Sequence, residues 1–257
     1  MLPQGTLDTF VSSTRRPVSE AIFTSNEIHD RGSVFVANIY RAATPQDAKQ
    51  RVEQMKRVVH SAKPATHEMS AWRCMTLKPG HSGLAGPEDF ELQSGCKDDG
   101  ERWAGGKILN VMETLGILDA VVIVSRWYGG EMLGPARFDH IAECATEVAK
   151  KFKAQEELLE LRSLLESLDV LLFDLRKEYQ QLSAEKVPPS DSTSSSTSAP
   201  APKPTVTIKK PDYATLDVTK AKRLIRAREG SITSVKSLIA KLRASEDSEP
   251  ALPPNHE

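Results

Sequence analysis

The sequence predicts an α/β fold, more closely a two-layer α+β sandwich. A long leucine-rich helix and a mostly disordered tail with basic helices are expected to follow. Three observations lead to this prediction. Strand-like and amphipathic helical segments alternate as far as residue 152, which is typical of layered folds. A leucine heptad comes next, and a stretch rich in Pro, Ser and Thr separates it from a basic region.

The first strand and helix are expected near residue 40. Residues 33–40 (SVFVANIY) are rich in β-branched and aromatic residues, which predicts a strand. Thr44 and Asp47 can form a capping box, and Pro45 suits the first helical position, so a helix is expected to begin there. The inward face of this helix is expected to hold Ala48, Val52, Met55 and Val59.

The same alternation continues further along the chain. Residues 71–77 predict a second strand, and residues 79–97 are rich in Gly and Pro and predict a loop. Residues 104–115 predict a helix that ends at Gly116. Residues 120–125 begin with the longest apolar run in the chain, which is typical of a strand covered on both faces.

A leucine heptad gives the clearest helical signal. Gly134 and Pro135 open a helix, and residues 153–186 are expected to form a leucine-heptad helix or coiled coil. Alternating spacings of three and four define its seam: Leu158, Leu161, Leu165, Leu168, Leu172, Leu175, Tyr179 and Leu182. Two partners for this seam stay open, since spacing alone does not choose between them. The helix could fold back on the front domain, or it could form a homodimer through Leu158–Leu182.

The other segments differ in composition. Residues 1–24 form an N-terminal extension before the first predicted strand. Residues 187–211 are a linker with few apolar side chains, so disorder is expected. Residues 212–244 are basic and carry two apolar helical stripes, which Gly230 is expected to separate. Residues 245–257 form an acidic tail that is also expected to be disordered.

Composition excludes several classes of protein. The 34 Lys and Arg residues balance the 35 Asp and Glu residues, which argues against a uniformly basic nucleic-acid-binding protein. The longest apolar run is residues 120–124, far short of the ~20 residues that span a bilayer. No secretory signal is visible, so no membrane partner is expected. The three widely spaced cysteines match neither a disulfide framework nor a zinc site and favour a cytoplasmic location.

The densest polar motifs lie between residues 97 and 138. Asp98, Asp99 and Glu101 could bind a divalent cation or act as general acid and base. The simpler interpretation, which we favour, is an acidic turn with one carboxylate held by Arg126 or Arg137. No Ser-His-Asp or Cys-His arrangement is legible, so an enzyme is not predicted.

Two further motifs leave alternatives open. The glycine-rich start of the 104–115 helix could bind an anion, or its glycines could allow close packing of helix on strand. Trp127 and Tyr128, which precede Gly129 and Gly130, could stack bases, form a protein hot spot or fill the core.

Five stretches, in this order along the chain, resemble the Impact family, which has animal, yeast and bacterial members. They are ATHEMSAWR at residues 65–73, DDGE at 98–101, AGGKIL at 104–109, VVIVSRWYGG at 121–130 and LGPARFDHI at 133–141. The resemblance is to the eukaryotic branch, because SRWYGG and LGPxRF stand where bacterial members differ.

The resemblance covers about residues 25–152 and implies a fold similar to the second domain of ribosomal protein five of the small subunit. It also implies a non-enzymatic role in the regulation of translation initiation. Eukaryotic members inhibit the amino-acid-starvation kinase that phosphorylates initiation factor two, by competing for the kinase's large ribosome-associated activator. Protein partners of the translational control machinery or the ribosome are therefore expected. RNA binding is the alternative, a metal-dependent hydrolase is a third, and no cofactor or metal is expected.

The family motif carries over onto sixteen positions, which we expect to form a binding surface with no catalytic role. They are His67, Arg73, Asp98, Asp99, Gly100, Glu101, Ala104, Gly105, Arg126, Trp127, Gly129, Gly130, Leu133, Gly134, Arg137 and Phe138. Trp103 stands where the family usually has a smaller residue, and its ring is expected to narrow a pocket there. Only 24 residues precede the matching region, so the RWD domain of animal and yeast members is expected to be lacking.

Overall fold

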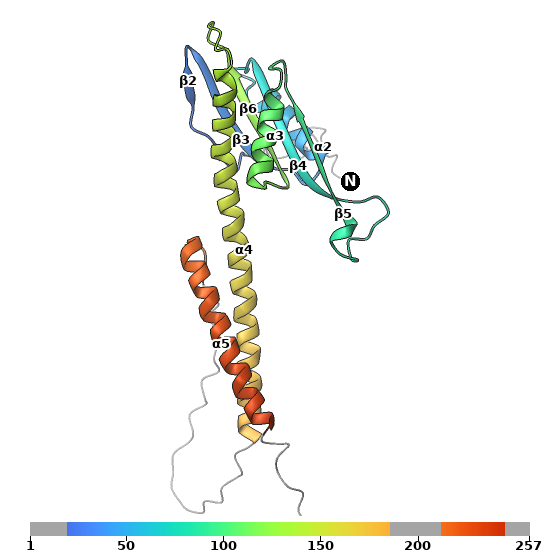
Figure 1. The fold of residues 1–257 in the computed structure, drawn as a ribbon, viewed down its shortest axis with the longest axis vertical. Coiled ribbons are helices and arrows are strands. Elements are labelled where there is room, and N and C mark those ends of the chain that lie inside the picture. Colours follow the sequence, from blue (N-terminus) through green and yellow to red (C-terminus); the bar gives the residue numbers. More distant parts are fainter. Residues whose placement is uncertain (1–19, 186–211, 245–257) are drawn as a thin grey trace, which may run out of the picture. The chain divides into compact units, whose positions relative to one another are not determined.

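The computed structural model of the chain describes residues 20–185 and 212–244 (Figure 1). Two compact units divide between Ala154 and Gln155. The first is built on a β-sheet, and the described residues of the second contain two helical segments. None of the helices in these ranges is long and apolar enough to cross a membrane.

The first unit contains one six-stranded sheet in the order β1-β3-β6-β4-β5, with β2 also paired to β3. Neighbouring strands pair antiparallel throughout. The strands are β1 (Phe23–Thr24), β2 (Ile28–Asp30), β3 (Ser33–Arg41), β4 (His67–Leu77), β5 (Phe90–Lys97) and β6 (Ala120–Trp127). The helical elements within the described ranges are α2 (Pro45–Gln54), η1 (Met55–Val59), η2 (Pro87–Asp89), α3 (Ala104–Leu115), α4 (Ala136–Glu185) and α5 (Val218–Ala244). The predicted fold class is confirmed.

The central strand β6 is buried on both faces, as its apolar sequence predicts. Successive side chains of a strand point to opposite faces. Ala120, Val122 and Val124 therefore join one core cluster with α3 and the first part of α4, which lie on the same face in Figure 1. Val121 and Ile123 join a second cluster with α2 on the other face. This double cover fixes β6 and the residues that follow it.

The capping box at the start of α2 is confirmed. The N–H of Asp47 donates to Thr44 Oγ1 at 3.1 Å, and the N–H of Thr44 donates to an Asp47 carboxylate oxygen at 3.1 Å. The predicted inward face is wrong at its end, because Val59 is 48% exposed. The helix widens over η1, where the N–H of His60 donates to the carbonyl of Met55, and this wider turn rotates Val59 off the apolar face.

The loop predicted over residues 79–97 is wrong for its second half, which is strand β5. This strand pairs with β4 from Phe90 opposite Leu77 to Lys97 opposite Ser70. A Cβ at Gly95 would lie 2.4 Å from the Trp72 ring, so glycine is needed there for close approach. The Gly and Pro content of the segment predicted a loop, but β5 is an edge strand that is stabilised by its pairing with β4.

In the second unit, residues 155–185 of α4 pack against α5. Lys222 pairs with Glu157 at 2.6 Å, and Arg243 pairs with Glu178 at 2.5 Å. Both partners advance in the same direction along the chain, so the two helices run parallel. Leu165 is fully buried in a cluster to which Tyr213, Ala221 and Ile225 also belong. The partner of the leucine seam is thus a helix of the same chain, which is neither of the two partners that the sequence left open.

Helix α5 is continuous, so the predicted break at Gly230 is wrong. The Ser231 hydroxyl donates to the carbonyl of Ala227, which lies one turn earlier, and does not cap a new helix. A glycine inside a helix costs about 1 kcal/mol relative to alanine. Burial of Ile225, Ile232 and Ile239 along one face offsets that cost.

Three of the predictions lie outside the described residues. They are the extension up to residue 19, the linker over residues 187–211 and the acidic tail over residues 245–257.

Candidate functional site

The DDGE motif begins with a carboxylate that caps helix α3. The two oxygens of Asp98 accept the N–H groups of Gly105 and Trp103, each at 2.9 Å. These N–H groups belong to the first turn, whose donors have no partner within the helix. A Cβ at Gly105 would lie 2.8 Å from the Lys97 carbonyl oxygen, and Ala104 beside it is fully buried. The geometry favours close packing over an external anion at this helix start.

Asp99 connects the motif to β4 and η1. Its carboxylate accepts Lys56 Nζ at 2.6 Å and the N–H of Glu68 at 2.7 Å. Burial raises the pKa of Asp99, but these two hydrogen bonds outweigh burial and hold the pKa below its usual range. His67 Nδ1 lies 3.0 Å from the Asp99 carbonyl oxygen. A Cβ at Gly100, where φ is +87°, would lie only 3.1 Å from that ring nitrogen.

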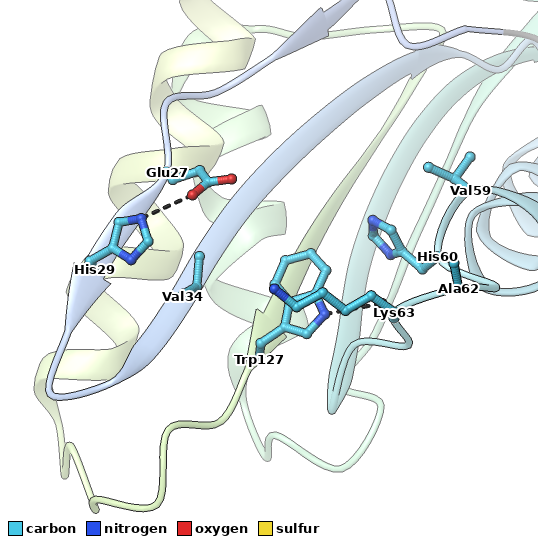
Figure 2. A pocket seen from close by; sticks show the side chains of 8 residues that line it. All are labelled: Glu27, His29, Val34, Val59, His60, Ala62, Lys63 and Trp127. Atoms are coloured by element: carbon cyan, nitrogen blue, oxygen red, sulfur yellow. Dashed lines mark hydrogen bonds and ion pairs between the residues drawn. The ribbon is translucent and has the colours of Figure 1, made fainter.

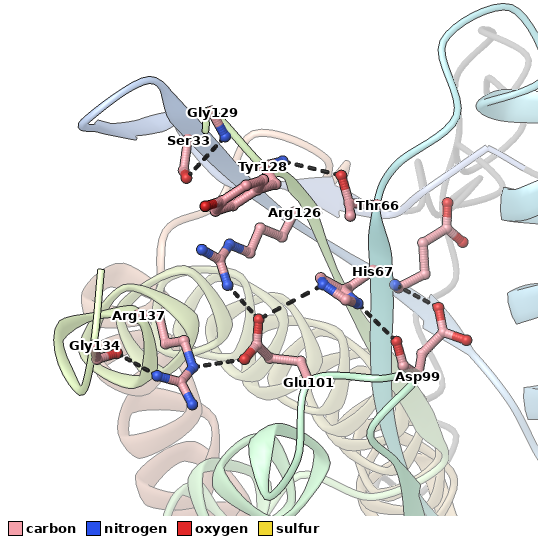
Figure 3. A network of polar contacts seen from close by, with 11 residues as sticks. Ser33, Thr66, His67, Asp99, Glu101, Arg126, Tyr128, Gly129, Gly134 and Arg137 are labelled. Carbon is pink, nitrogen blue, oxygen red and sulfur yellow. Dashed lines mark hydrogen bonds and ion pairs between the residues drawn. The ribbon is translucent and has the colours of Figure 1, made fainter. Parts of the chain in front are cut away.

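Glu101 lies at the centre of a network that we call the Glu101 cluster, formed by Glu101, His67, Arg126 and Arg137 (Figure 3). Arg137 Nε donates to Glu101 Oε1 at 2.6 Å, and Arg126 Nη1 donates to Oε2. His67 Nε2 lies 4.0 Å from Oε2. Glu101 is 6% exposed and Arg126 is 5% exposed. Both arginines hold the carboxylate, which agrees with the simpler of the two predicted interpretations.

The two guanidinium groups are also fixed on their other sides. Arg126 lies 5.3 Å from the ring centroid of Phe35 and 5.4 Å from that of Tyr128. Arg137 Nη1 donates to the carbonyl of Gly134 at 2.5 Å, and its guanidinium lies 4.3 Å from the ring centroid of Phe138. Each guanidinium group of the Glu101 cluster is thus held from two sides, and the groups of the cluster are positioned by β4, β6 and the start of α4.

A glycine corner follows β6 and turns the chain away from the sheet. The N–H of Gly129 donates to Ser33 Oγ at 3.2 Å. A Cβ at Gly129 would lie 1.9 Å from the carbonyl carbon of Gly32, so no other residue fits. Gly130 has a φ of +92°, a conformation that favours glycine. Leu133 then returns to the core and is nearly fully buried.

Three exposed apolar side chains come from the loops that also carry members of the cluster, and one of them, Tyr128, contacts Arg126. Trp103 is 61% exposed, and its ring lies 4.5 Å from the Arg102 guanidinium. Its predicted role of narrowing a pocket is not what the structure shows, because the ring faces solvent. Tyr128 and Met132 are also exposed. We call the surface formed by Trp103, Tyr128, Met132 and the Glu101 cluster the docking face.

Arg73 lies apart from the other predicted site residues. Its Nη1 donates to the carbonyls of Ile117 at 3.0 Å and Met112 at 3.3 Å, where α3 ends. Arg73 is six positions beyond His67 along β4, which is about 20 Å at 3.3 Å per residue. Arg73 therefore stabilises the far end of the sheet.

Trp127 lies on the opposite face of the sheet from Arg126, because it is the next residue of the same strand. Its Nε1 donates to the carbonyl of Lys63 at 3.2 Å, and the Lys63 ammonium lies 5.8 Å from the ring centroid. His60 meets the indole edge-on at 5.0 Å and contacts buried Glu68 at 2.7 Å. A pocket of about 290 Å³ opens beside this indole (Figure 2). It is lined by Glu27, His29, Val34, Val59, His60, Ala62, Lys63 and Trp127.

Sequence reasoning missed the contributions of Lys56, His60 and Lys63. They lie in and after η1, whose wider turn no pattern predicted. Strand alternation is the signal that could have separated Trp127 from Arg126. In the described part of the chain, no group of three or more His, Cys, Asp or Glu side chains is arranged to hold a metal ion.

Comparison with known proteins finds a family match that lies within the first unit. Residues 31–149 match the family described as Impact N-terminal domain. The chain is 38% identical over 147 residues to Protein IMPACT of Bos taurus, covering 56% of this chain and 42% of that protein. It is 35% identical over 154 residues to Protein IMPACT of Mus musculus, covering 57% and 43%. The chain thus spans less than half the length of these curated relatives.

Among the solved structures that match is that of Yih1, described as a two-domain translational regulator. The sequence identity is 30% and the TM-score 0.33, with 54% of this chain and 51% of that chain covered. Residues 31–149 are therefore similar to the Impact N-terminal domain, both by the family match and by identity to these relatives.

Proposed function

We propose that this protein is a non-enzymatic regulator of translation initiation. It acts in the cytoplasm by binding proteins of the translational control machinery or the ribosome, and so modulates the amino-acid-starvation kinase response. The observation that carries the proposal is the match of residues 31–149 to the Impact N-terminal domain. The role in the amino-acid-starvation kinase response is proposed because the motifs resemble those of the eukaryotic members.

The contacts of the acidic motif support a binding role. Asp98, Asp99 and Glu101 are each held by backbone N–H groups or cationic side chains of the chain itself. A carboxylate fixed in this way positions its neighbours. A general base instead needs to reach a substrate proton, within about 3 Å. These contacts support a structural role for the DDGE motif, in which its carboxylates fix the residues around them.

The composition of the docking face suits a protein partner. Trp, Tyr, Met and Arg are the residue types enriched in protein interfaces, and Trp, Tyr and Arg dominate binding hot spots. Trp103, Tyr128 and Met132 supply the exposed apolar area, and the side chains of the Glu101 cluster are held by hydrogen bonds to one another. A rigid surface loses little conformational freedom on binding, which favours affinity.

Affinity purification from amino-acid-starved cells tests the proposal. The full chain is expected to recover translation factors or ribosome-associated proteins, and a Trp103→Ser/Tyr128→Ser variant is expected to lose most of them. Leu84→Ser is the matched control, because Leu84 is 90% exposed on a loop outside the docking face. Equal recovery by the wild type and both variants, or recovery of no translation component, would contradict the proposal.

The Trp127 pocket favours a second candidate function, which is RNA binding. An indole with an ammonium group close to its ring can stack a base while the cation meets a phosphate. Arg126 and Arg137 are already held by Glu101, so Lys63 would be the nearer phosphate contact. RNA affinity is then expected to fall steeply with salt and to drop in a Trp127→Leu variant. A salt-independent affinity would exclude this candidate.

A further inference from the structure

The second half of α4 carries a second heptad stripe on a different side from the leucine seam. We call it the outer stripe: Leu159, Ser163, Glu166, Val170, Phe173, Lys177, Gln180 and Ala184. Its spacings alternate between four and three, which places all eight residues on one face of a helix. The stripe covers 26 residues, or about 39 Å at 1.5 Å per residue.

Exposure separates the two stripes. All eight residues of the outer stripe are exposed, whereas the seam residues are buried or half-buried, and Leu161, Leu165 and Leu168 pack in the cluster with α5. Val170 is 62% exposed, Phe173 is 43% exposed and Leu159 is 42% exposed. Large apolar side chains that are exposed along one face of a helix are typical of an interaction surface. These three apolar side chains therefore remain exposed even though α5 packs on the seam.

The stripe is complementary to itself when two copies run antiparallel. A two-fold axis between Leu171 and Leu172 places Val170 opposite Phe173 of the second copy. The same axis places Glu166 opposite Lys177, so each interface holds two opposite-charge pairs. Outside these layers, Ser163 meets Gln180, which can form hydrogen bonds, and Leu159 meets Ala184. Symmetric contacts of this kind, in which each residue and its partner exchange roles, define a closed two-fold dimer.

Charge favours this arrangement over the alternatives. A parallel dimer would place Glu166 against Glu166 and Lys177 against Lys177, and like charges at such positions are destabilising. An antiparallel pair shifted by one heptad would place Lys177 opposite Phe173 or opposite Leu159. Of these arrangements, only the antiparallel one without a shift pairs Glu166 with Lys177, which have opposite charges, and Val170 with Phe173, which are both apolar.

We propose that the outer stripe of α4 is the docking site for a second copy of this chain, bound antiparallel. The two-fold axis crosses the outer stripe midway between Val170 and Phe173, which is the level of the helix between residues 171 and 172. Such a dimer leaves the α4–α5 pair intact and brings four helices together. It differs from a homodimer through Leu158–Leu182, which would require α5 to leave the seam. The interface is small and partly polar, so the dimer forms and dissociates with concentration.

Sedimentation equilibrium of the full chain over a wide range of concentration tests the first part. The mean mass is expected to rise from 28.3 kDa toward twice that value. Val170→Ser/Phe173→Ser is expected to stay monomeric throughout the range. Leu171→Ser is the matched control, because this leucine is also exposed but lies outside the stripe, and it should dimerise as the wild type does. A wild-type chain that stays monomeric would overturn the proposal.

Charge reversal tests the register. Glu166→Lys and Lys177→Glu are each expected to weaken self-association about tenfold, since each replaces two attractions by two repulsions. A mixture of the two variants is expected to form heterodimers as tight as the wild type, because all facing charges are then opposite. The double variant should also recover. A mixture that does not associate, or a double variant as weak as the singles, would overturn the antiparallel register. Circular dichroism verifies that each variant keeps its helices.

Discussion

Removal of the Glu101 carboxylate is predicted to destabilise the first unit strongly. Glu101→Ala leaves Arg126 with a charge that is 5% exposed and has lost its carboxylate partner. Breaking a buried ion pair in this way costs about 3–5 kcal/mol. Arg137 is more exposed and can turn toward water, so the lower end of that range is expected. A loss of about 3 kcal/mol corresponds to a fall in Tm of roughly 6–12 °C.

Urea unfolding followed by tryptophan fluorescence measures this change in the right part of the molecule. All three tryptophans, Trp72, Trp103 and Trp127, lie in the first unit, so the signal does not report on the α4–α5 pair. A loss of about 3 kcal/mol shifts the urea midpoint by about 2 M at a typical slope.

Two variants separate a buried pair from an ordinary surface pair. Glu53→Ala removes the exposed Glu53–Arg57 pair and is expected to cost less than about 1 kcal/mol. Glu101→Ala/Arg126→Met is expected to recover at least half of the loss, because a methionine can lie between the rings of Phe35 and Tyr128 without a charge. If Glu101→Ala unfolds as the wild type does, the reasoning about the cluster is refuted.

Three further predictions concern single side chains. Asp99→Asn is expected to cost about 1 kcal/mol at pH 7. Because folding lowers the pKa of Asp99, this loss is expected to vanish as the pH falls below 3.8, and a difference that persists in acid urea curves would count against the assignment. Gly129→Ala is expected to cost about 3 kcal/mol, because the new Cβ would clash with the backbone of Gly32. Gly106→Ala has open space around it and is expected to stabilise α3 by about 0.5–1 kcal/mol. Equal changes in the free energy of unfolding for the two variants would contradict this geometry. Burial raises the pKa of the Cys144 thiol to about 11. A thiol reagent at pH 8 is therefore expected to label the exposed Cys96 before Cys144. Mass spectrometry that finds Cys144 labelled first would contradict the burial of this thiol.

Local signals predicted the elements whose stability is local. The capping box at Thr44 and the left-handed Gly116 that ends α3 depend on a few neighbouring residues, and both are confirmed. The apolar run in β6 also sufficed, because cover on both faces excludes polar side chains from it. Strand β5 was missed because it depends on pairing with β4, and no short window of sequence contains both strands.

The candidate site was predicted in part for the same reason. The residues that touch Glu101 are far apart in sequence; the charges predicted that Arg126 or Arg137 holds a carboxylate of the acidic turn, but no pattern identified Glu101 as that carboxylate or showed that both arginines hold it. Arg73 and Trp127 belong to the family motif but lie at the other end of β4 and on the other face of β6. The seam on α4 fixed a helix and its apolar face, but its partner α5 follows a long intervening segment, so spacing could not identify it.

Phosphorylation of initiation factor two in amino-acid-starved cells tests the central claim most directly. Expression of the full chain is expected to lower this phosphorylation severalfold, and the Trp103→Ser/Tyr128→Ser variant, expressed at the same level and equally folded, is expected to restore it. Phosphorylation that stays the same with and without the wild-type chain would contradict a role in the starvation response. An equal reduction by the wild type and the variant would contradict the assignment of that role to the docking face.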